Sequence, residues 1–205
     1  MGKLLLIFCI FIFSTPAFSQ DRPDAYLKYK NREYEEAVAI CLNELESMPR
    51  NMDSYTVLGW SLLALGRNEE ALEYGEKAYE ILPTDPRIVE ILGEAHFRLE
   101  NNLESLVYFE RYAVLYPTGQ RIDVVYNLMG EILLRLKEYN HADIAFSTAV
   151  YHSSNISKWW ARLGYAREMA ENYRYALEAY EKALSLNPTL TDAIRGRDRA
   201  TDNLR

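Results

Sequence analysis

Apolar and small residues recur along this chain with a spacing of about 34 positions. In four consecutive segments an apolar residue is followed directly by glycine: Leu58-Gly59, Leu92-Gly93, Met129-Gly130 and Leu163-Gly164. These glycines are 34, 37 and 34 residues apart. A fixed period of this length predicts an array of helix pairs, because each pair has an apolar face that only a neighbouring pair can cover.

Two further columns of the repeat predict a second helix in each segment. Small residues occupy its first half, at Ala71, Ser105, Ala142 and Ala176. Its end is marked by Pro83, Pro117, Ser154 and Pro188. Small residues allow two helices to approach closely, and proline ends a helix because it lacks an N–H group and clashes with the preceding turn. The pattern therefore predicts helix pairs over residues 52–85, 86–119, 123–156 and 157–190.

This pattern resembles the tetratricopeptide repeat (TPR) family, whose aromatic, Leu-Gly, Ala, aromatic, Ala and Pro columns are matched over residues 52–190. The resemblance implies an all-α, right-handed superhelical solenoid of antiparallel helix pairs. It extends weakly to residues 24–51, which are expected to form an atypical N-terminal repeat. Residues 191–205 are polar and are predicted to form a capping helix with Thr191 as its N-cap.

The chain departs from the family pattern at four places. Gly75 replaces the usual aromatic residue, and we expect Tyr74 or Tyr79 to fill part of that space. Tyr112 replaces a small residue, so the third unit should pack differently around it. Residues 120–122 lengthen one connection, and Ser154 replaces the usual proline at the end of the fourth unit. Uneven bending or twisting is therefore expected between the third and fifth units.

Composition indicates one folded domain preceded by a signal peptide. The chain has 205 residues, of which 49% are hydrophobic and 26% charged, as in ordinary globular proteins. At its start, Lys3 precedes the apolar run Leu4 to Phe13, and small residues follow at Ala17 and Ser19. This order predicts a signal peptide over residues 1–19, with the mature domain over 20–205. The apolar run is shorter than the ~20 residues that span a bilayer. Export to the periplasm is the first expectation, and secretion the alternative.

Charge and motifs argue against several function classes. Without residues 1–19 the chain has 22 basic and 30 acidic residues, a balance that disfavours nucleic acid as a partner. Sequence motifs of phosphate-binding, zinc-binding and serine-hydrolase sites do not occur. His141 and His152 would stand ~16 Å apart on one helix, too far to share a metal ion. No catalytic residue, metal or cofactor is predicted, and Cys41 is expected to be a buried apolar residue.

In the TPR family the first helices of successive units line the concave face of the solenoid. By this resemblance the candidate partner-binding groove contains Asp53, Trp60, Glu90, Glu94, Phe97, Asn127, Glu131 and Tyr165. The middle of this stripe is acidic, and aromatic residues flank it. Exposed Trp and Tyr are frequent in binding hot spots. The Lys and Asn positions with which some family members hold a terminal carboxylate are absent. The stripe predicts an extended or helical polypeptide partner with basic and apolar side chains.

Several alternatives remain open from the sequence. The first hypothesis is a non-catalytic adaptor of the cell envelope that binds proteins. The second is a subunit that binds a small ligand or glycan, with Trp60 and Tyr165 stacking on it, and a deep pocket with few polar groups would favour it. The stripe could also bind nothing or cover a terminal helix, and residues 191–205 could be a basic docking tail. The oligomeric state is not predicted.

Overall fold

The computed structural model describes residues 24–205, so the predicted signal peptide lies outside the described residues. This range contains helices and no strand. The helices are α1 (Ala25–Lys30), α2 (Tyr34–Ser47), α3 (Met52–Ala64), α4 (Asn68–Ile81), α5 (Pro86–Arg98), α6 (Asn102–Leu115), α7 (Ile122–Arg135), α8 (Tyr139–His152), α9 (Ser157–Met169), α10 (Tyr173–Leu186) and α11 (Thr191–Asn203). Among them, none is long and apolar enough to span a membrane.

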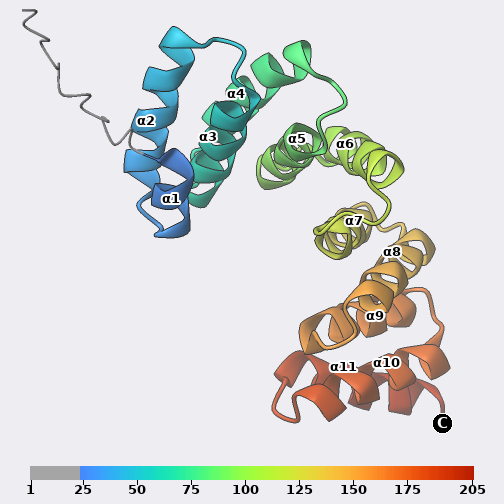
Figure 1. Ribbon diagram of the computed structural model, residues 1–205. Helices are drawn as coiled ribbons and strands as arrows, with labels where there is room; N and C mark the ends of the chain where they lie inside the picture. The colour runs from blue at the N-terminus through green and yellow to red at the C-terminus, as the bar shows by residue number, and fades with distance from the viewer. Residues whose placement is uncertain (1–23) are drawn as a thin grey trace, which may run out of the picture.

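The helices form a curved array in which each packs against its neighbours in sequence (Figure 1). The odd-numbered helices lie toward the inside of the curve and the even-numbered helices toward the outside. Contacts between α3 and α5, and between α9 and α11, join successive inner helices. The predicted all-α solenoid of helix pairs is therefore confirmed. The inner helices present one continuous surface, which we call the inner face.

Close approach of the two helices within a pair explains three of the four repeated glycines, Gly93, Gly130 and Gly164. A Cβ atom on Gly130 of α7 would lie 2.7 Å from Cε1 of Phe146, which is fully buried on α8. Tyr180 on α10 is enclosed from two sides, because Gly164 of α9 and Gly196 of α11 both pack against its ring. A side chain at these positions would clash with a buried aromatic ring.

The space directly beside Gly75 is filled from the next helix pair, while Tyr74 and Tyr79 pack against the same core. A Cβ atom on Gly75 would lie 2.8 Å from Cδ2 of Leu92, and Ile91 packs directly against Gly59. Two aliphatic side chains from α5, in the next pair, are thus the nearest neighbours of Gly75. Ile91 and Leu92 are both buried, and they join the second pair to the third through one continuous apolar core.

Tyr112 fills the junction at the lengthened connection. Its side chain is buried in a cluster of α5, α6 and α7 that includes Val89, Phe109 and Val125. The Tyr112 ring also lies 6.3 Å from the ring of Tyr116 at the end of α6. At this junction the α5, α6 and α7 helices thus meet through the Tyr112 side chain, where the family usually has a small residue. The connection that follows carries Arg121, which takes part in the inner face.

The turn inside each helix pair uses one residue in the left-handed region of backbone conformation. Positive φ angles occur at Arg32 (65°), Gly66 (75°), Glu100 (61°), Lys137 (62°) and Glu171 (61°). Each of them directly follows the C-cap residue of an inner helix, where such a conformation ends a helix. The same turn in α1–α2 shows that residues 24–51 repeat the geometry of the other pairs, although α1 has only 6 residues.

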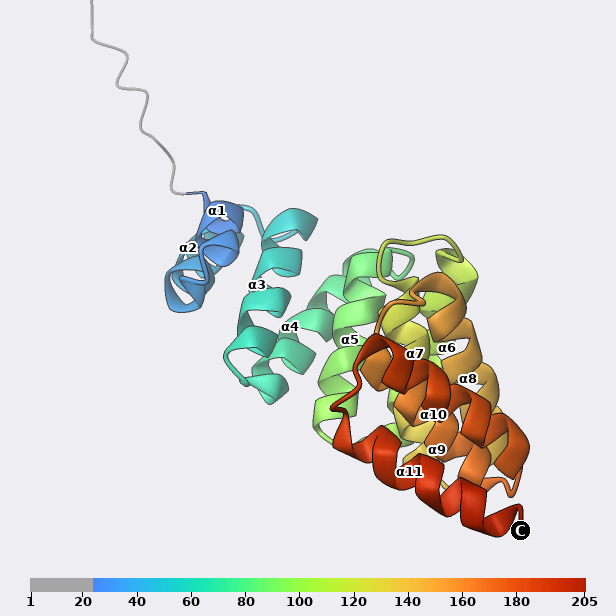
Figure 2. The same cartoon turned by 90° about the horizontal axis from the view of Figure 1, so that it is seen from below.

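The last helix closes the array. Helix α11 packs along α9 and α10 at the C-terminal end (Figure 2), with Ala193, Gly196 and Ala200 buried. Leu190 is at its N-cap position and no side chain caps the helix, so the prediction of Thr191 as N-cap is wrong. Thr191 is instead the first helical residue. Helix α11 thereby takes the place that the first helix of a sixth pair would occupy.

Candidate functional site

Two hollows lie along the inner face. The N-terminal hollow has a volume of about 660 Å³ and is lined by Trp60 of α3, Arg87 and Glu90 of α5, and Tyr112, Tyr116 and Arg121. It lies where α3 and α5 meet the lengthened connection before α7. Both aromatic rings and charged groups line it, so it combines apolar contact area with hydrogen-bonding groups.

The C-terminal hollow lies between α7, α9 and α11. Its volume is about 630 Å³, and its walls include Asn127, Glu131, Lys158, Trp159, Arg162, Tyr165, Arg195 and Arg199. Tyr180 of α10, already enclosed between two glycines, forms part of its wall. Both hollows are open to solvent rather than closed cavities. Together they place aromatic side chains near both ends of one surface.

Ion pairs connect every successive pair of inner helices from α3 to α11. Four carboxylates each bind an arginine from the next inner helix or the residue before it: Asp53–Arg87, Glu90–Arg121, Glu131–Arg162 and Glu168–Arg199. In three of them the arginine is 31 residues after the carboxylate. Arg87 Nη1 lies 2.7 Å from Asp53 Oδ1, and Arg199 Nε lies 2.6 Å from Glu168 Oε1. The carboxylates predicted to make the stripe acidic are therefore paired within the chain.

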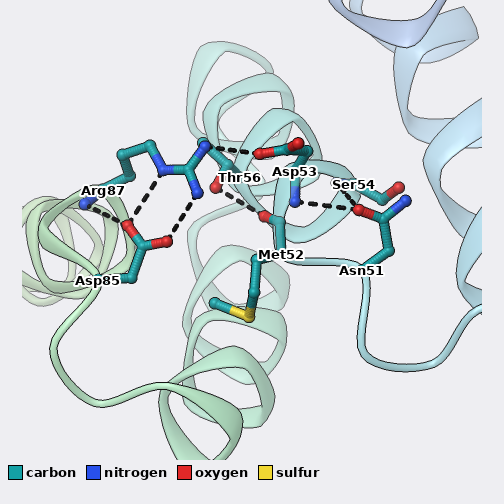
Figure 3. Close-up of polar contacts among 7 residues, drawn as sticks. All are labelled: Asn51, Met52, Asp53, Ser54, Thr56, Asp85 and Arg87. Atoms are coloured by element: carbon teal, nitrogen blue, oxygen red, sulfur yellow. Dashed lines mark hydrogen bonds and ion pairs between the residues drawn. The ribbon is translucent and has the colours of Figure 1, made fainter.

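The first of these pairs is built on a helix N-terminus (Figure 3). Asp85 caps α5 by accepting the backbone N–H of Arg87 at 2.9 Å, and its other oxygen accepts the Arg87 Nη2–H at 2.7 Å. The same guanidinium donates to Asp53 of α3 at 2.7 Å. At the start of α3, Asn51 caps the helix by accepting the backbone N–H of Asp53 at 3.1 Å. Arg87 thus fixes the spacing between α3 and α5.

Glu90 and Glu94 share Arg121. Glu90 is only 5% exposed, and Arg121 donates a hydrogen bond to it, while Arg121 Nη2 lies 3.5 Å from Glu94 Oε2. Burial raises the pKa of Glu90, and the positive charge of Arg121 opposes that rise without cancelling it. Glu94 also pairs with Arg98 of the same helix. The buried carboxylate therefore depends on an arginine from the lengthened connection.

The aromatic residues of the predicted groove are partly covered from within the chain. The Trp60 ring lies 5.6 Å from the Tyr29 ring of α1. The guanidinium of Arg135 lies 4.2 Å above the Phe97 ring, and that of Arg162 lies 5.4 Å from the Tyr165 ring. All three predicted aromatic residues are half-buried, so each keeps some surface for contact with a partner.

The structure brings five of the eight predicted groove residues to the hollows. Trp60 and Glu90 line the N-terminal hollow, and Asn127, Glu131 and Tyr165 line the C-terminal hollow. Asp53, Glu94 and Phe97 lie outside both hollows, in the arginine contacts described above. Sequence reasoning missed Arg121 and Arg162, although the 31-residue spacing of each arginine from a carboxylate is visible in the chain.

Asn127 differs from its neighbours in the C-terminal hollow. Its side-chain oxygen is buried and accepts no hydrogen bond within residues 24–205. Leaving such a group without a partner costs about 1–3 kcal/mol. Stability alone therefore gives no reason for an amide at this position.

Metal-ligating clusters and cysteine were the remaining candidate groups for chemistry. No group of three or more His, Cys, Asp or Glu side chains within residues 24–205 is placed to hold a metal ion. Cys41 is fully buried on α2, as predicted, and burial raises the pKa of its thiol to about 12. At neutral pH the thiol is therefore protonated and poorly reactive.

Comparisons with known proteins agree with this architecture. Two family models described as tetratricopeptide repeat match residues 24–86 and 157–190. No curated protein sequence matches the chain. Among solved structures, MamA is 19% identical with a TM-score of 0.72, covering 80% of this chain and 94% of MamA. YrrB, described as a TPR protein with an unusual peptide-binding site, is 21% identical with a TM-score of 0.72, covering 85% of this chain and 88% of YrrB.

A third similar structure comes from a larger protein. It belongs to the Cut9–Hcn1 hetero-tetramer of the APC/C, with 19% identity and a TM-score of 0.72. The match covers 86% of this chain and 35% of that chain. At these identities the structures show a shared fold, and the family models match the repeats themselves. The chain belongs to the tetratricopeptide repeat family.

Proposed function

We propose that this protein is a non-catalytic scaffold that binds a polypeptide segment along its inner face. The repeat family and the solenoid fold support a role in protein interaction. One observation carries the choice of surface: two hollows of about 660 and 630 Å³ lie on the same face, each lined by aromatic and charged side chains. Aromatic residues and arginine are the side chains that most often dominate binding energy at protein interfaces.

The alternative of a small-ligand or glycan site is less well supported by this geometry. Such sites are commonly one enclosed, mostly apolar pocket with a few polar groups. Here the space is divided between two open hollows at different positions along the face, and both contain several charged side chains. An extended chain can enter both hollows at once, whereas one small molecule can enter only one. The peptide-binding description of the structurally similar YrrB supports the same choice.

Peptide selection tests the proposal. Phage-displayed 12-residue peptides would be selected on the immobilised chain, and an enriched peptide would be titrated against Trp60→Ala, Tyr165→Ala and the outer-face control Tyr151→Ala. We expect each inner-face substitution to weaken binding at least about tenfold, as for a hot-spot residue, with Tyr151→Ala unchanged. Thermal melts would identify any variant that fails to fold. Equal effects of all three substitutions in folded proteins would refute the inner-face assignment.

We also propose that the scaffold acts after export, in the periplasm or outside the cell. Support comes from the order of Lys3, the apolar run and the small residues before position 20. Mass spectrometry of the protein recovered from its native cells would measure its N-terminus. A mature chain that begins at residue 20 is expected, and a chain that retains residues 1–19 in the cytoplasm would refute export.

A further inference from the structure

Resting on the proposed function, we infer that the C-terminal hollow recognises acidic side chains of the bound polypeptide. Lys158 of α9 and Arg195 of α11 both line this hollow and are exposed. Within residues 24–205, neither forms an ion pair with a carboxylate of the chain.

The remaining charges of this hollow are satisfied or isolated. Arg162 binds Glu131, with Nε and Oε1 2.6 Å apart. Arg199 binds Glu168, whose other oxygen also accepts the Tyr180 hydroxyl at 2.6 Å. Asp192 also lines the hollow, in the first turn of α11, where the helix dipole stabilises a carboxylate. With Arg162 and Arg199 paired, two cations, Lys158 and Arg195, remain in the hollow against one carboxylate, Asp192.

The N-terminal hollow lacks this surplus. Its two arginines, Arg87 and Arg121, are both paired with its two carboxylates, Asp85 and Glu90. The hollow is neutral and rich in aromatic rings, so it suits an apolar side chain. The inner face is thus polarised along its length, with an apolar subsite near α3–α6 and a cationic subsite near α7–α11. This proposal differs from the basic partner expected from the sequence, because Glu90, Glu94 and Glu131 are paired with arginines of the chain.

The surroundings of the cationic subsite favour a polypeptide over other anions. Trp159 and Tyr165, both half-buried, place aromatic surface beside the two free cations. Two unpaired cations on a chain with net charge −7 are too few to hold a nucleic-acid backbone, which needs a clustered basic face. An Asp or Glu side chain next to an apolar residue complements both the charges and the rings.

The test uses the full mature chain and the same phage-displayed 12-residue peptides. Selection would be run on the unaltered chain, on Lys158→Gln/Arg195→Gln, and on a matched control, Arg50→Gln/Lys182→Gln. The control removes one lysine and one arginine that are exposed and outside both hollows. We expect acidic peptides to be enriched on the unaltered chain and the control and not on the hollow variant. An enriched acidic peptide should bind the hollow variant about tenfold more weakly than the control at low salt.

Other outcomes would overturn the inference. Enriched peptides without Asp or Glu, sensitive to Trp60→Ala but not to Lys158→Gln/Arg195→Gln, would refute the acidic specificity and leave the proposed function in place. Equal weakening by the hollow variant and the control would show that only net charge matters and would also refute it. Failure to enrich any peptide on the folded, unaltered chain would refute the proposed function, and the inference with it.

Discussion

At the scale of single residues, two kinds of contact hold the array together. Glycines let an aromatic ring of the partner helix pack against the backbone, as Gly130 does for Phe146. Arginines bind carboxylates one helix pair away, as Arg87 does for Asp53. The first contact supplies apolar burial inside the core, and the second fixes the spacing of the inner helices. Each can be tested separately.

Gly130→Ala should lower the free energy of unfolding. Alanine is intrinsically better than glycine in a helix by about 1 kcal/mol, but its Cβ would lie within 2.8 Å of three atoms of the Phe146 ring. Overpacking of this kind costs about 1–3 kcal/mol, so it should outweigh the helix preference. Urea unfolding would measure the change. The double variant with Phe146→Leu should regain part of the loss. A Gly130→Ala protein more stable than the unaltered chain would contradict the packing described here.

Asp85→Asn should destabilise the protein at neutral pH more than Asp53→Asn does. Both carboxylates bind Arg87, but the Asp85 side chain is 5% exposed and that of Asp53 83%. We expect losses of about 1–2 kcal/mol for Asp85→Asn, typical of a buried charge-assisted hydrogen bond, and under about 0.5 kcal/mol for Asp53→Asn. Urea unfolding at pH 7 would compare them. Equal losses would show that burial of Asp85 adds nothing.

The same substitution should change the response to acid. Burial alone would raise the pKa of Asp85, but the hydrogen bonds and positive charge of Arg87 lower it below the usual 3.8. Asp85 thus contributes stability above the unfolded-state value of 3.8, and that contribution is lost as pH falls through its lower folded-state pKa. The difference between Asp85→Asn and the unaltered chain should therefore shrink below about pH 4. Melts recorded from pH 7 to pH 3 would show a constant difference if the carboxylate were unimportant.

At the scale of elements, the turns and the last helix repeat one design with different residues. The turn inside each pair needs a left-handed residue, yet only Gly66 among the five is glycine. In helix α11, Gly196 packs against the Tyr180 ring and Arg199 binds Glu168. These are the contacts that the inner helix of a further pair would make. The geometry of the element is thus conserved between pairs even where the residue type differs.

Lys137→Gly should stabilise the turn between α7 and α8. Lys137 has a φ of 62° and is exposed, so its side chain contributes little packing. Glycine removes the strain of a left-handed residue, but it also loses more conformational entropy on folding. The two effects together should raise the free energy of unfolding by about 0.5 kcal/mol. Urea unfolding would measure it, with Lys137→Ala as the control that keeps the Cβ atom. A loss of stability in the glycine variant would contradict the assigned turn.

Removal of residues 191–205 should lower the melting temperature. Helix α11 covers Tyr180, which is 1% exposed, and its loss would expose that ring and leave Glu168 without Arg199. We expect a fall of roughly 5 °C or more. Arg195→Gln is the matched control, because Arg195 is exposed on the same helix. An unchanged melt in the truncated chain would favour the docking-tail alternative over a cap.

At the scale of the whole molecule, the repeat period was sufficient to predict the solenoid, because stacking is the only way for each helix pair to bury its apolar face. The inner-face residues followed from the family resemblance. The compensation of Glu90 and Glu131 could not be predicted from the columns alone, since Arg121 lies in the inserted connection and Arg162 outside the predicted stripe. Similarly, Ile91 fills the space beside Gly59 from the next pair, a long-range contact that no local pattern specifies.

The central claim is that a polypeptide binds along the inner face. Site-specific photo-cross-linking tests it most directly, with a photoreactive amino acid placed at Gln120 or Lys158 beside the two hollows, or at Val107 or Lys182 on the outer helices. Mass spectrometry would then detect any covalent adduct with a peptide selected on the full chain. Adducts at Gln120 and Lys158, and none at Val107 or Lys182, are predicted. Adducts confined to the outer helices would contradict the claim.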